Sequence, residues 1–366
     1  MACPGAWIVK VRAKLANIGS SRFVAAFGVS ILEVMGTSPT LSYLGYESSR
    51  ERPNVVVDGS PNEGTVLTLT HWPGYPVDKN LAGDLSADIV FNYLDHIAAE
   101  GLDVEAEVVT ANHFDQDGLV SVHALVHPEE SFAHRELLCD LAAAGDFAVY
   151  SDRRAARASM VFSRLAEREM VGDYGSFTDE LFIESLPMVL PVLLDPSRYQ
   201  DYWADEDHEL GRSEDAIAER RITFDCHDDV DLAVIHIPED FESSGGHRFG
   251  GERFGDVHPM AVNNVVDQFR LLIVVGRRFR FVDRYESWVQ YRSRPFLRRV
   301  DMRPLAEVLT SLEHRPVNWM ATGPGSLTPE LRHRGESNLC PDDVVSHIVN
   351  YLRTQPPAWD PFNEQD

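Results

Sequence analysis

The sequence has few lysines and a large deficit of positive charge. Lysine occurs only at Lys10, Lys14 and Lys79, so arginine supplies nearly all of the basic side chains. With 58 acidic residues against 33 basic ones, the formal net charge is -25. A nucleic-acid-binding protein needs a broad basic surface, so this composition excludes a general nucleic-acid coat. A local basic patch remains compatible with it.

The four cysteines are far apart and form no Cys-x-x-Cys pair. This spacing excludes a cysteine-based zinc module and predicts no disulfide framework. It is typical of a reducing compartment, so we predict a cytoplasmic protein. Apolar runs of membrane-spanning length are also missing, and we expect no membrane partner.

The beginning of the chain resembles a leader. Residues 1–22 carry basic but no acidic side chains, and the apolar stretch FVAAFGVSIL follows. That order is typical of a secretory signal. However, Glu33 interrupts the apolar run, and the Met-Gly-Thr after it makes a poor cleavage site. We therefore expect residues 1–45 to be a loosely ordered leader, or the result of a start codon assigned too early.

Several familiar motifs are absent. There is no Walker loop, no GxGxxG fingerprint and no GxSxG nucleophile elbow. No internal repeat of solenoid length occurs. These absences disfavour nucleoside triphosphatases, dinucleotide-binding enzymes and typical α/β-hydrolases.

Strand and helix patterns alternate from residue 54 onward. Four runs rich in apolar residues predict strands at 54–59, 65–71, 104–111 and 146–152. Helices are predicted between and after them, over residues 84–101, 119–126 and 153–167. This alternation predicts an α/β fold in which a mostly parallel sheet is flanked by helices. We assign this domain to residues 46–168.

The remainder of the chain predicts two further parts and a tail. Residues 169–220 lack strand patterns and predict a helical connector. A second, smaller α/β domain is expected at 221–356, with a polar tail at 357–366. Within it, residues 269–294 alternate strongly enough to predict two strands, joined either near Gly276 to Arg278 or at Asp283.

Titratable side chains follow the predicted strands of the first domain. In parallel α/β sheets, ligands bind at the carboxyl ends of the strands. The segment HFDQDG (113–118) combines one nitrogen ligand with two hard oxygen ligands, which suits Mn²⁺ or Mg²⁺ better than structural zinc. We predict a site for one or two such ions at Asp58, His71, His113, Asp115 and Asp117.

Roles within this site can be assigned by residue type. We expect His71, His113 and Asp117 to act in catalysis. Ser121, predicted in the first turn of the following helix, would bind substrate where that helix offers free amides to an anion. A plain turn is the alternative for HFDQDG, because Asp and Asn often bond their own backbone.

The sequence HFDQDGLVS resembles the first motif of the DHH (Asp-His-His) phosphoesterase superfamily. Its members hydrolyse phosphodiesters or phosphoanhydrides with two divalent cations, usually manganese, and join such a domain to a smaller substrate-binding domain. The resemblance implies that His113, Asp115 and Asp117 serve a metal site. This chain lacks an Asp-His-His triplet, and its nearest equivalents, Asp58 and His71, precede the motif instead of following it.

The second domain offers candidate substrate-binding residues. Ten arginines fall between residues 270 and 303, and guanidinium groups suit phosphate. We predict that Arg278 and Arg280 bind the substrate; the alternative is a hairpin whose arginines pair with acidic groups. The Gly-rich loop 245–259 resembles the Gly-Gly-His substrate loop of the DHH small domain, which implies a similar role for His247 and His258.

Together these features predict a metal-dependent phosphoesterase that acts on a small anionic or nucleotide-like substrate. One alternative is a non-catalytic, nucleotide- or anion-binding regulatory protein on a degenerate version of the same scaffold. Another is a hydrolase that uses His113 and Asp115 as acid and base without a metal. Carboxylate oxygens that converge to coordination distance would favour the metal-dependent phosphoesterase.

Overall fold

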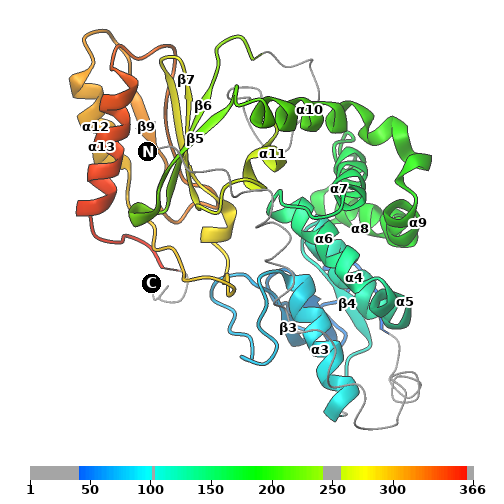
Figure 1. Cartoon of the computed structure of the whole chain (residues 1–366). Helices are drawn as coiled ribbons and strands as arrows, with labels where there is room; N and C mark the ends of the chain where they lie inside the picture. Colours follow the sequence, from blue (N-terminus) through cyan, green and yellow to red (C-terminus); the bar gives the residue numbers. More distant parts are fainter. Residues whose placement is uncertain (1–40, 101–103, 242–256, 361–366) are drawn as a thin grey trace.

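The computed structural model describes residues 41–100, 104–241 and 257–360 (Figure 1). The described residues form a four-stranded parallel sheet and a six-stranded mixed sheet. Helices flank both sheets. The predicted α/β class with two sheet domains is thereby confirmed.

The first sheet has the strand order β1-β4-β2-β3, and every neighbouring pair is parallel. Its strands are β1 (Ser42–Tyr43), β2 (Asn54–Val57), β3 (Thr65–Leu69) and β4 (Val108–Thr110). Strands β2 and β4 are completely buried, as expected for apolar runs in a parallel sheet. Strand β1 lies within the stretch predicted to be a leader, so the sheet begins before residue 46; residues 1–40 are outside the described part.

Helices α3 (Ser86–Glu100) and α4 (Gln116–Val126) pack against this sheet, and α6 (Arg135–Asp146) and α7 (Arg153–Ala166) pack beyond α4. The short α5 (Pro128–Ala133) lies between α4 and α6. Helix α4 begins three residues earlier than predicted. The reason is that the Asp115 side chain accepts a hydrogen bond from the Gly118 amide and caps the helix.

Residues 146–152, predicted to be a strand, do not form one. They follow the end of α6, and their backbone groups bond to side chains instead of a neighbouring strand. The Tyr150 amide donates to Asn264, whose side chain donates back to the Tyr150 carbonyl, and Asn263 donates to the Phe147 carbonyl. Both asparagines come from the second domain, at the end of helix α11 (Pro259–Asn263).

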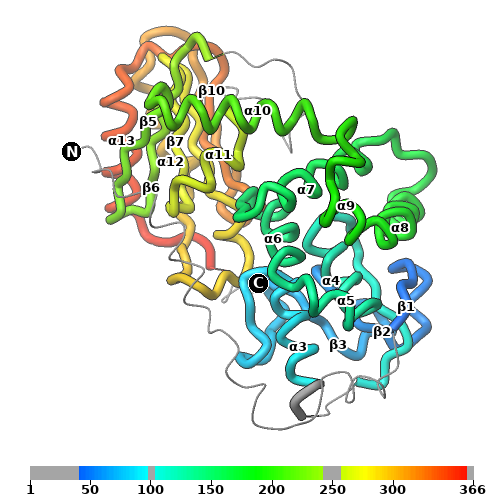
Figure 2. Tube along the Cα trace, turned by 45° about the vertical axis from the view of Figure 1, so that its right-hand side comes forward, coloured from blue at the N-terminus to red at the C-terminus, as the bar shows by residue number. Residues whose placement is uncertain are grey.

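The predicted connector is helical throughout most of its length. It comprises α8 (Tyr174–Ser185), α9 (Val189–Leu194) and the long α10 (Gln200–Ala218), which runs to the second sheet (Figure 2). Helix α8 ends at Ser185 and the chain continues as a 3-10 turn over Leu186–Met188, since Pro187 has no amide hydrogen to donate to an α-helical hydrogen bond. Within the described residues, no helix has both the length and the apolar character needed to cross a membrane.

The second sheet has the order β5-β6-β7-β8-β10-β9, in which only β6 and β7 are parallel. Its strands are β5 (Thr223–His227), β6 (Leu232–Ile237), β7 (Arg270–Val275), β8 (Arg278–Asp283), β9 (Trp319–Ala321) and β10 (Glu330–His333). Strands β7 and β8 form the predicted hairpin, and of the two predicted junctions it uses the one at Gly276, whose φ of 56° suits glycine.

Alternating residues of β6 face two different sets of helices. Leu232 and Val234 pack with α12 (Arg303–Leu312) and α13 (Pro341–Thr354). Ala233 and Ile235 pack on the opposite face with residues of α10 and α11. Figure 1 shows these helices on either side of the sheet. The sheet is therefore buried on both faces, while the segment after β8 continues toward the first domain.

Candidate functional site

The predicted metal ligands lie together at the carboxyl edge of the parallel sheet. Asp58 directly follows β2, and His71 follows β3. His113 and Asp115 lie between β4 and α4, while Asp117 is in the first turn of α4. Because β4, β2 and β3 are adjacent and parallel, the residues after them meet at one edge.

Two ligand groups share Asp58. In the first, His113 Nε2 is 3.4 Å from Asp58 Oδ2 and 3.0 Å from Asp115 Oδ2. In the second, His71 Nε2 is 3.4 Å from Asp58 Oδ1 and 3.8 Å from Asp117 Oδ2. Within each group the candidate ligand atoms lie within 4.8 Å of one another, close enough to hold one ion. Each oxygen of Asp58 thus faces a different group.

Asp146 belongs to the same cluster but was not singled out by its sequence. Its Oδ2 lies 3.6 Å from His71 Nε2 and has no hydrogen-bond partner among the described residues. It reaches the site from the last turn of α6, where no strand-end pattern marks it. Asp152, which follows the wrongly predicted strand, instead caps α7 by accepting a hydrogen bond from the Arg154 amide.

Backbone and side-chain acceptors orient both histidines toward the carboxylates. The Asp84 carbonyl can only accept, so His71 Nδ1 donates to it over 2.8 Å. A neutral His71 therefore directs an unprotonated Nε2 at the acidic cluster, and that buried atom has no hydrogen-bond partner in the described structure. His113 Nδ1 similarly lies 3.1 Å from Asn112 Oδ1. Metal-binding histidines are typically held in this way by their second ring nitrogen.

The beginning of α3 fixes two of the carboxylates. The Ser86 and Ala87 amides donate to the two oxygens of Asp117, over 2.7 and 2.8 Å. The Ser86 hydroxyl donates to Asp58 Oδ1 over 2.7 Å and accepts a hydrogen bond from the His71 amide. One serine therefore connects the ends of β2 and β3 with a helix N-terminus, whose dipole favours negative charge.

The cluster concentrates negative charge where little water is present. Burial alone would raise the pKa of Asp58, but the adjacent imidazoles of His71 and His113 and the hydrogen bond from Ser86 lower it to about 2. Burial opposes protonation of the histidines, yet nearby carboxylates raise the pKa of His71 and of His113 to about 9. Burial and neighbouring acids raise the pKa values of Asp117 and Asp146 well above their usual range.

Without a cation, these groups therefore compensate their charge by holding protons. A divalent cation would supply the same compensation, and it would give His71 Nε2 and Asp146 Oδ2 a partner. Histidine nitrogen and aspartate oxygen are also the donor types that Mn²⁺ accepts. The residues thus fit a metal in both charge and chemistry.

The second domain forms one wall of the site. The Gln290 amide donates to the His71 carbonyl over 2.7 Å, and its side chain donates to the carbonyls of Trp72 and Tyr75. The backbone amides of residues 292 and 293 bond to the Asp84 side chain, whose own carbonyl holds His71.

Aromatic rings extend this wall beside the histidines. The Trp72 ring lies 5.2 Å from His113 and 5.5 Å from Trp288, and the Tyr285 ring lies 6.1 Å from His71. Burial, followed by the charge of Asp146 and the other carboxylates, raises the pKa of Tyr285 well above its usual range. Its phenol therefore stays protonated beside the acidic cluster.

The other predicted site residues do not join the cluster. Ser121 is buried in the second turn of α4, since the helix starts earlier than expected. His258 is buried and holds α10 through Glu206, 2.9 Å from its Nε2. Arg280 pairs with Glu330, and Arg278 is exposed at the far end of β8. His247 lies outside the described residues.

The arginine-rich region serves mainly the structure of the second domain. Arg299 is fully buried and donates to the carbonyls of residues 324, 326 and 327. Arg270 is buried against Asp283, while Arg294 pairs with Asp231. These observations favour the alternative prediction, in which the arginines pair with acidic and carbonyl groups.

The fold and site define a two-domain α/β protein with a buried Asp/His cluster at the edge of its parallel sheet. A model of a family of unknown function, DUF6687, matches residues 39–363. This match spans both sheets and the helical connector, so the chain belongs to that family. No curated protein and no solved structure matches the chain.

Proposed function

We propose that the Asp/His cluster binds two divalent cations, Mn²⁺ or Mg²⁺, and that the protein is a metal-dependent phosphoesterase. One ion would be held by Asp58, His113 and Asp115. The other would be held by Asp58, His71 and Asp117, with Asp146 close by. Asp58 would connect the two.

The observation that carries this proposal is the environment of His71 Nε2. This buried atom has no hydrogen-bond partner among the described residues, although oxygens of three carboxylates lie 3.4 to 3.8 Å away. Its other nitrogen is committed to the Asp84 carbonyl. Orienting a lone pair toward buried carboxylates is costly unless a cation or a proton lies between them.

Bound metal ions would lower the pKa of a water molecule and polarise the phosphoryl group. The chain itself would contribute orientation and exclusion of water. Ser86 and the amides of α3 keep the carboxylates in place, and Trp72 with Trp288 shields the side facing the second domain. The Tyr285 phenol would donate a hydrogen bond to the substrate or to the leaving group.

The DHH-like motif supports this proposal in a rearranged form. Asp58 and His71 precede HFDQDG in the chain, yet they meet it at the same sheet edge. Chain order therefore does not prevent a DHH-like ligand set. The separation of the cysteines continues to favour a cytoplasmic location in our proposal.

The test is metal content and hydrolysis measured on the same preparation. Protein loaded with Mn²⁺ should contain up to two ions per chain and hydrolyse bis(p-nitrophenyl) phosphate. Asp58→Asn should lose both properties, whereas Asp152→Asn, at a half-buried helix cap outside the cluster, should keep both. Failure of the wild-type protein to bind metal would contradict the proposal. Metal binding without hydrolysis would instead favour the non-catalytic regulatory alternative.

A further inference from the structure

The two ligand groups of the cluster differ in their exposure to solvent. We call Asp58, His71 and Asp117 the closed group, and Asp58, His113 and Asp115 the open group. The side chains of His71 and Asp117 are both 0% exposed, whereas those of His113 and Asp115 are 24% and 27% exposed. Water and ligands can therefore reach the open group without any movement of the protein, while the closed group is covered by protein atoms.

The groups also differ in how their histidines are satisfied without a cation. In the open group, His113 Nε2 and Asp115 Oδ2 are hydrogen-bonded over 3.0 Å. In the closed group, His71 Nε2 has no hydrogen-bond partner among the described residues, and neither has Asp146 Oδ2, 3.6 Å from it. An ion in the open group would replace an existing hydrogen bond, whereas an ion in the closed group would satisfy two buried atoms that lack one. The closed group therefore gains more from a cation.

Negative charge is concentrated around the closed group. Oxygens of three carboxylates, those of Asp58, Asp117 and Asp146, lie 3.4 to 3.8 Å from His71 Nε2. Because the two groups share Asp58, an ion in the closed group leaves Asp115 as the unshared carboxylate of the open group. Buried charges are screened little by water and salt, so the closed group attracts a first ion more strongly.

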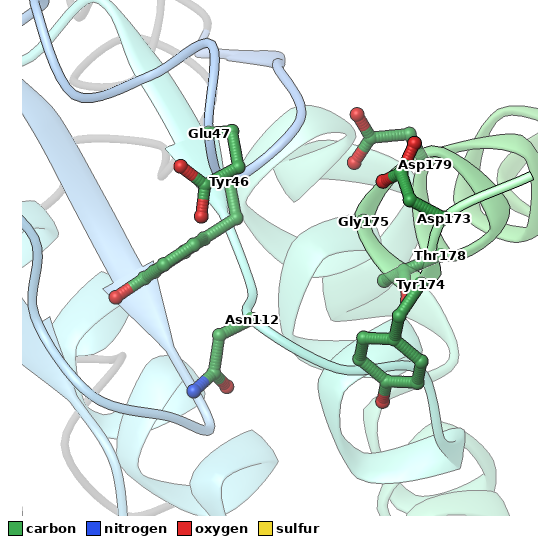
Figure 3. A pocket seen from close by; sticks show the side chains of 8 residues that line it. All are labelled: Tyr46, Glu47, Asn112, Asp173, Tyr174, Gly175, Thr178 and Asp179. Atoms are coloured by element: carbon green, nitrogen blue, oxygen red, sulfur yellow. The ribbon is translucent and has the colours of Figure 1, made fainter.

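The supports of the two histidines differ in the same direction. His71 Nδ1 donates to the Asp84 carbonyl, and the Asp84 side chain is fixed by the backbone amides of residues 292–293 from the second domain. His113 Nδ1 instead lies 3.1 Å from the side chain of Asn112, which lines a pocket of about 540 Å³ (Figure 3). The open group is therefore next to a cavity of the size of small-molecule sites, while the closed group is held from two domains.

We infer that the two ions are unequal: the closed group binds a first ion tightly and exchanges it slowly, and the open group binds a second, weaker ion that contacts the substrate. Catalytic metal sites keep a coordination position for water or substrate, whereas structural sites are enclosed by protein ligands. Activity would then follow the free Mn²⁺ concentration through the open group. The contact with the substrate rests on the proposed function, whereas the order of ion binding rests on the cluster alone.

The experiment is calorimetric titration of the full-length protein with Mn²⁺, after prolonged dialysis against EDTA and removal of the chelator. We expect two binding events whose dissociation constants differ at least tenfold. Gel filtration of the loaded protein into metal-free buffer should then leave one Mn²⁺ per chain, counted by atomic absorption.

Two matched variants assign the binding events to the groups. Asp115→Asn should abolish the weak event and leave the tight one within twofold of the wild type, because asparagine still caps α4. Asp146→Asn should weaken the tight event at least tenfold, since it removes a carboxylate beside His71 and leaves the open group intact. Asp152→Asn, at a helix cap outside the cluster, should leave both events unchanged.

Inorganic phosphate is the probe for contact with the substrate. It should bind to the protein that carries two Mn²⁺ ions, measured by calorimetry in the presence of excess Mn²⁺. It should not bind to the protein that keeps one ion after gel filtration, nor to Mn²⁺-treated Asp115→Asn. Phosphate binding to either of these forms would assign the contact to the closed group and overturn the inference.

The outcomes separate this inference from the proposed function. Two ions of equal affinity, or loss of both binding events in Asp115→Asn, would overturn the inference and leave a two-metal phosphoesterase standing. Two unequal ions without hydrolysis of bis(p-nitrophenyl) phosphate would support the order of ion binding and contradict the proposed reaction. A protein that binds no Mn²⁺ would contradict both.

Discussion

Asp58 adopts left-handed backbone geometry, with a φ of 46°, which residues other than glycine seldom occupy. Such a conformation costs about 1 to 3 kcal/mol and persists only where the surroundings enforce it. Here the Asp58 amide donates to the Leu69 carbonyl, and Ser86 holds one carboxylate oxygen. The strain therefore directs one carboxylate between two histidines.

A second cost at the scale of single residues lies at Asp146. Its buried carboxylate has acidic neighbours, and its Oδ2 has no hydrogen-bond donor among the described residues. In the metal-free protein, Asp146→Asn should raise the free energy of unfolding by about 2 kcal/mol, because folding no longer has to protonate a buried carboxylate whose pKa is raised in the folded state. In the same variant the affinity for Mn²⁺ should fall. Urea unfolding in EDTA and Mn²⁺ titration measure the two effects.

The matched control is Asp152→Asn, since asparagine caps helices as aspartate does and Asp152 lies at a half-buried helix cap. It should change neither the unfolding free energy nor the metal affinity. An Asp146→Asn protein that is less stable without metal would show that Asp146 serves the packing of α6 and not a charged site.

The buried His123 should make the free energy of unfolding decrease in mildly acidic solution. Burial, assisted by the charge of His127, lowers its pKa from 6.5 to about 4 in the folded state. Between these values the unfolded chain binds the extra proton, so stability falls as the pH drops from 6.5 to 4 and changes no further below. The loss is about 3 kcal/mol at most.

This effect can be isolated with His123→Gln. The difference in unfolding free energy between pH 7 and pH 4.5 should be smaller in this variant than in the wild type. Chemical denaturation at the two pH values measures it. Equal pH dependence of the two proteins would mean that His123 is already protonated in the folded state.

Residue types and positions after strands were enough to predict five members of the cluster. Asp58, His71 and His113 follow strands that the sequence marks clearly, and parallel strands bring their ends together. Asp146 was missed because it arrives from a helix end, which carries no comparable pattern. The sequence did not reveal the acidic partners of the second-domain arginines, because partners such as Glu330 of Arg280 are distant in sequence.

At the scale of elements, the short strands explain an unusual connection. Strands β2 and β3 are parallel neighbours joined by seven residues, 58–64, without a helix. A four-residue strand is only about 13 Å long, and seven extended residues span about 23 Å, so a short return suffices. This compact return places Asp58 and His71 side by side.

Local patterns predicted β2, β3, α3 and both strands of the hairpin, because each has its own periodicity and end signals. They failed over 146–152, where the short apolar stretch from Phe147 to Tyr150 resembles a strand. There the backbone is satisfied by asparagine side chains from the second domain, which no local pattern can reveal.

Helix α3 acts as a support for the cluster through its first residue. Ser86→Ala would remove the hydrogen bond to Asp58 and the acceptor of the His71 amide, while both amides that hold Asp117 would remain. We expect Mn²⁺ affinity to fall about tenfold or more, as is typical when a supporting partner is lost. Metal titration with circular dichroism as a check of folding measures this, and unchanged affinity would show that the strands alone orient Asp58.

At the scale of the whole molecule, the two domains share one core and one site. Tyr285, Trp288 and Val289 of the second domain pack in the hydrophobic core of the first. The same segment bonds the backbone of His71 and its neighbours. The arrangement of the domains should therefore influence metal binding directly.

Gln290→Leu tests this coupling. The backbone bond to the His71 carbonyl survives, but the carbonyls of Trp72 and Tyr75 lose their donor. Unsatisfied buried carbonyls cost about 1 to 3 kcal/mol each, and the loop that carries His71 would loosen. We expect lower thermal stability and about tenfold weaker Mn²⁺ binding, measured by calorimetry.

The control is Gln268→Leu, which replaces a half-buried glutamine of the second domain that bonds to Asp228 and Cys226. Both substitutions remove one amide from the same domain, but only Gln290 reaches the first domain. If the two variants lose stability equally and both retain full metal affinity, the second domain is a separate structural unit. If only Gln290→Leu binds metal weakly, the second domain is a part of the metal site, because it holds the backbone from which His71 projects.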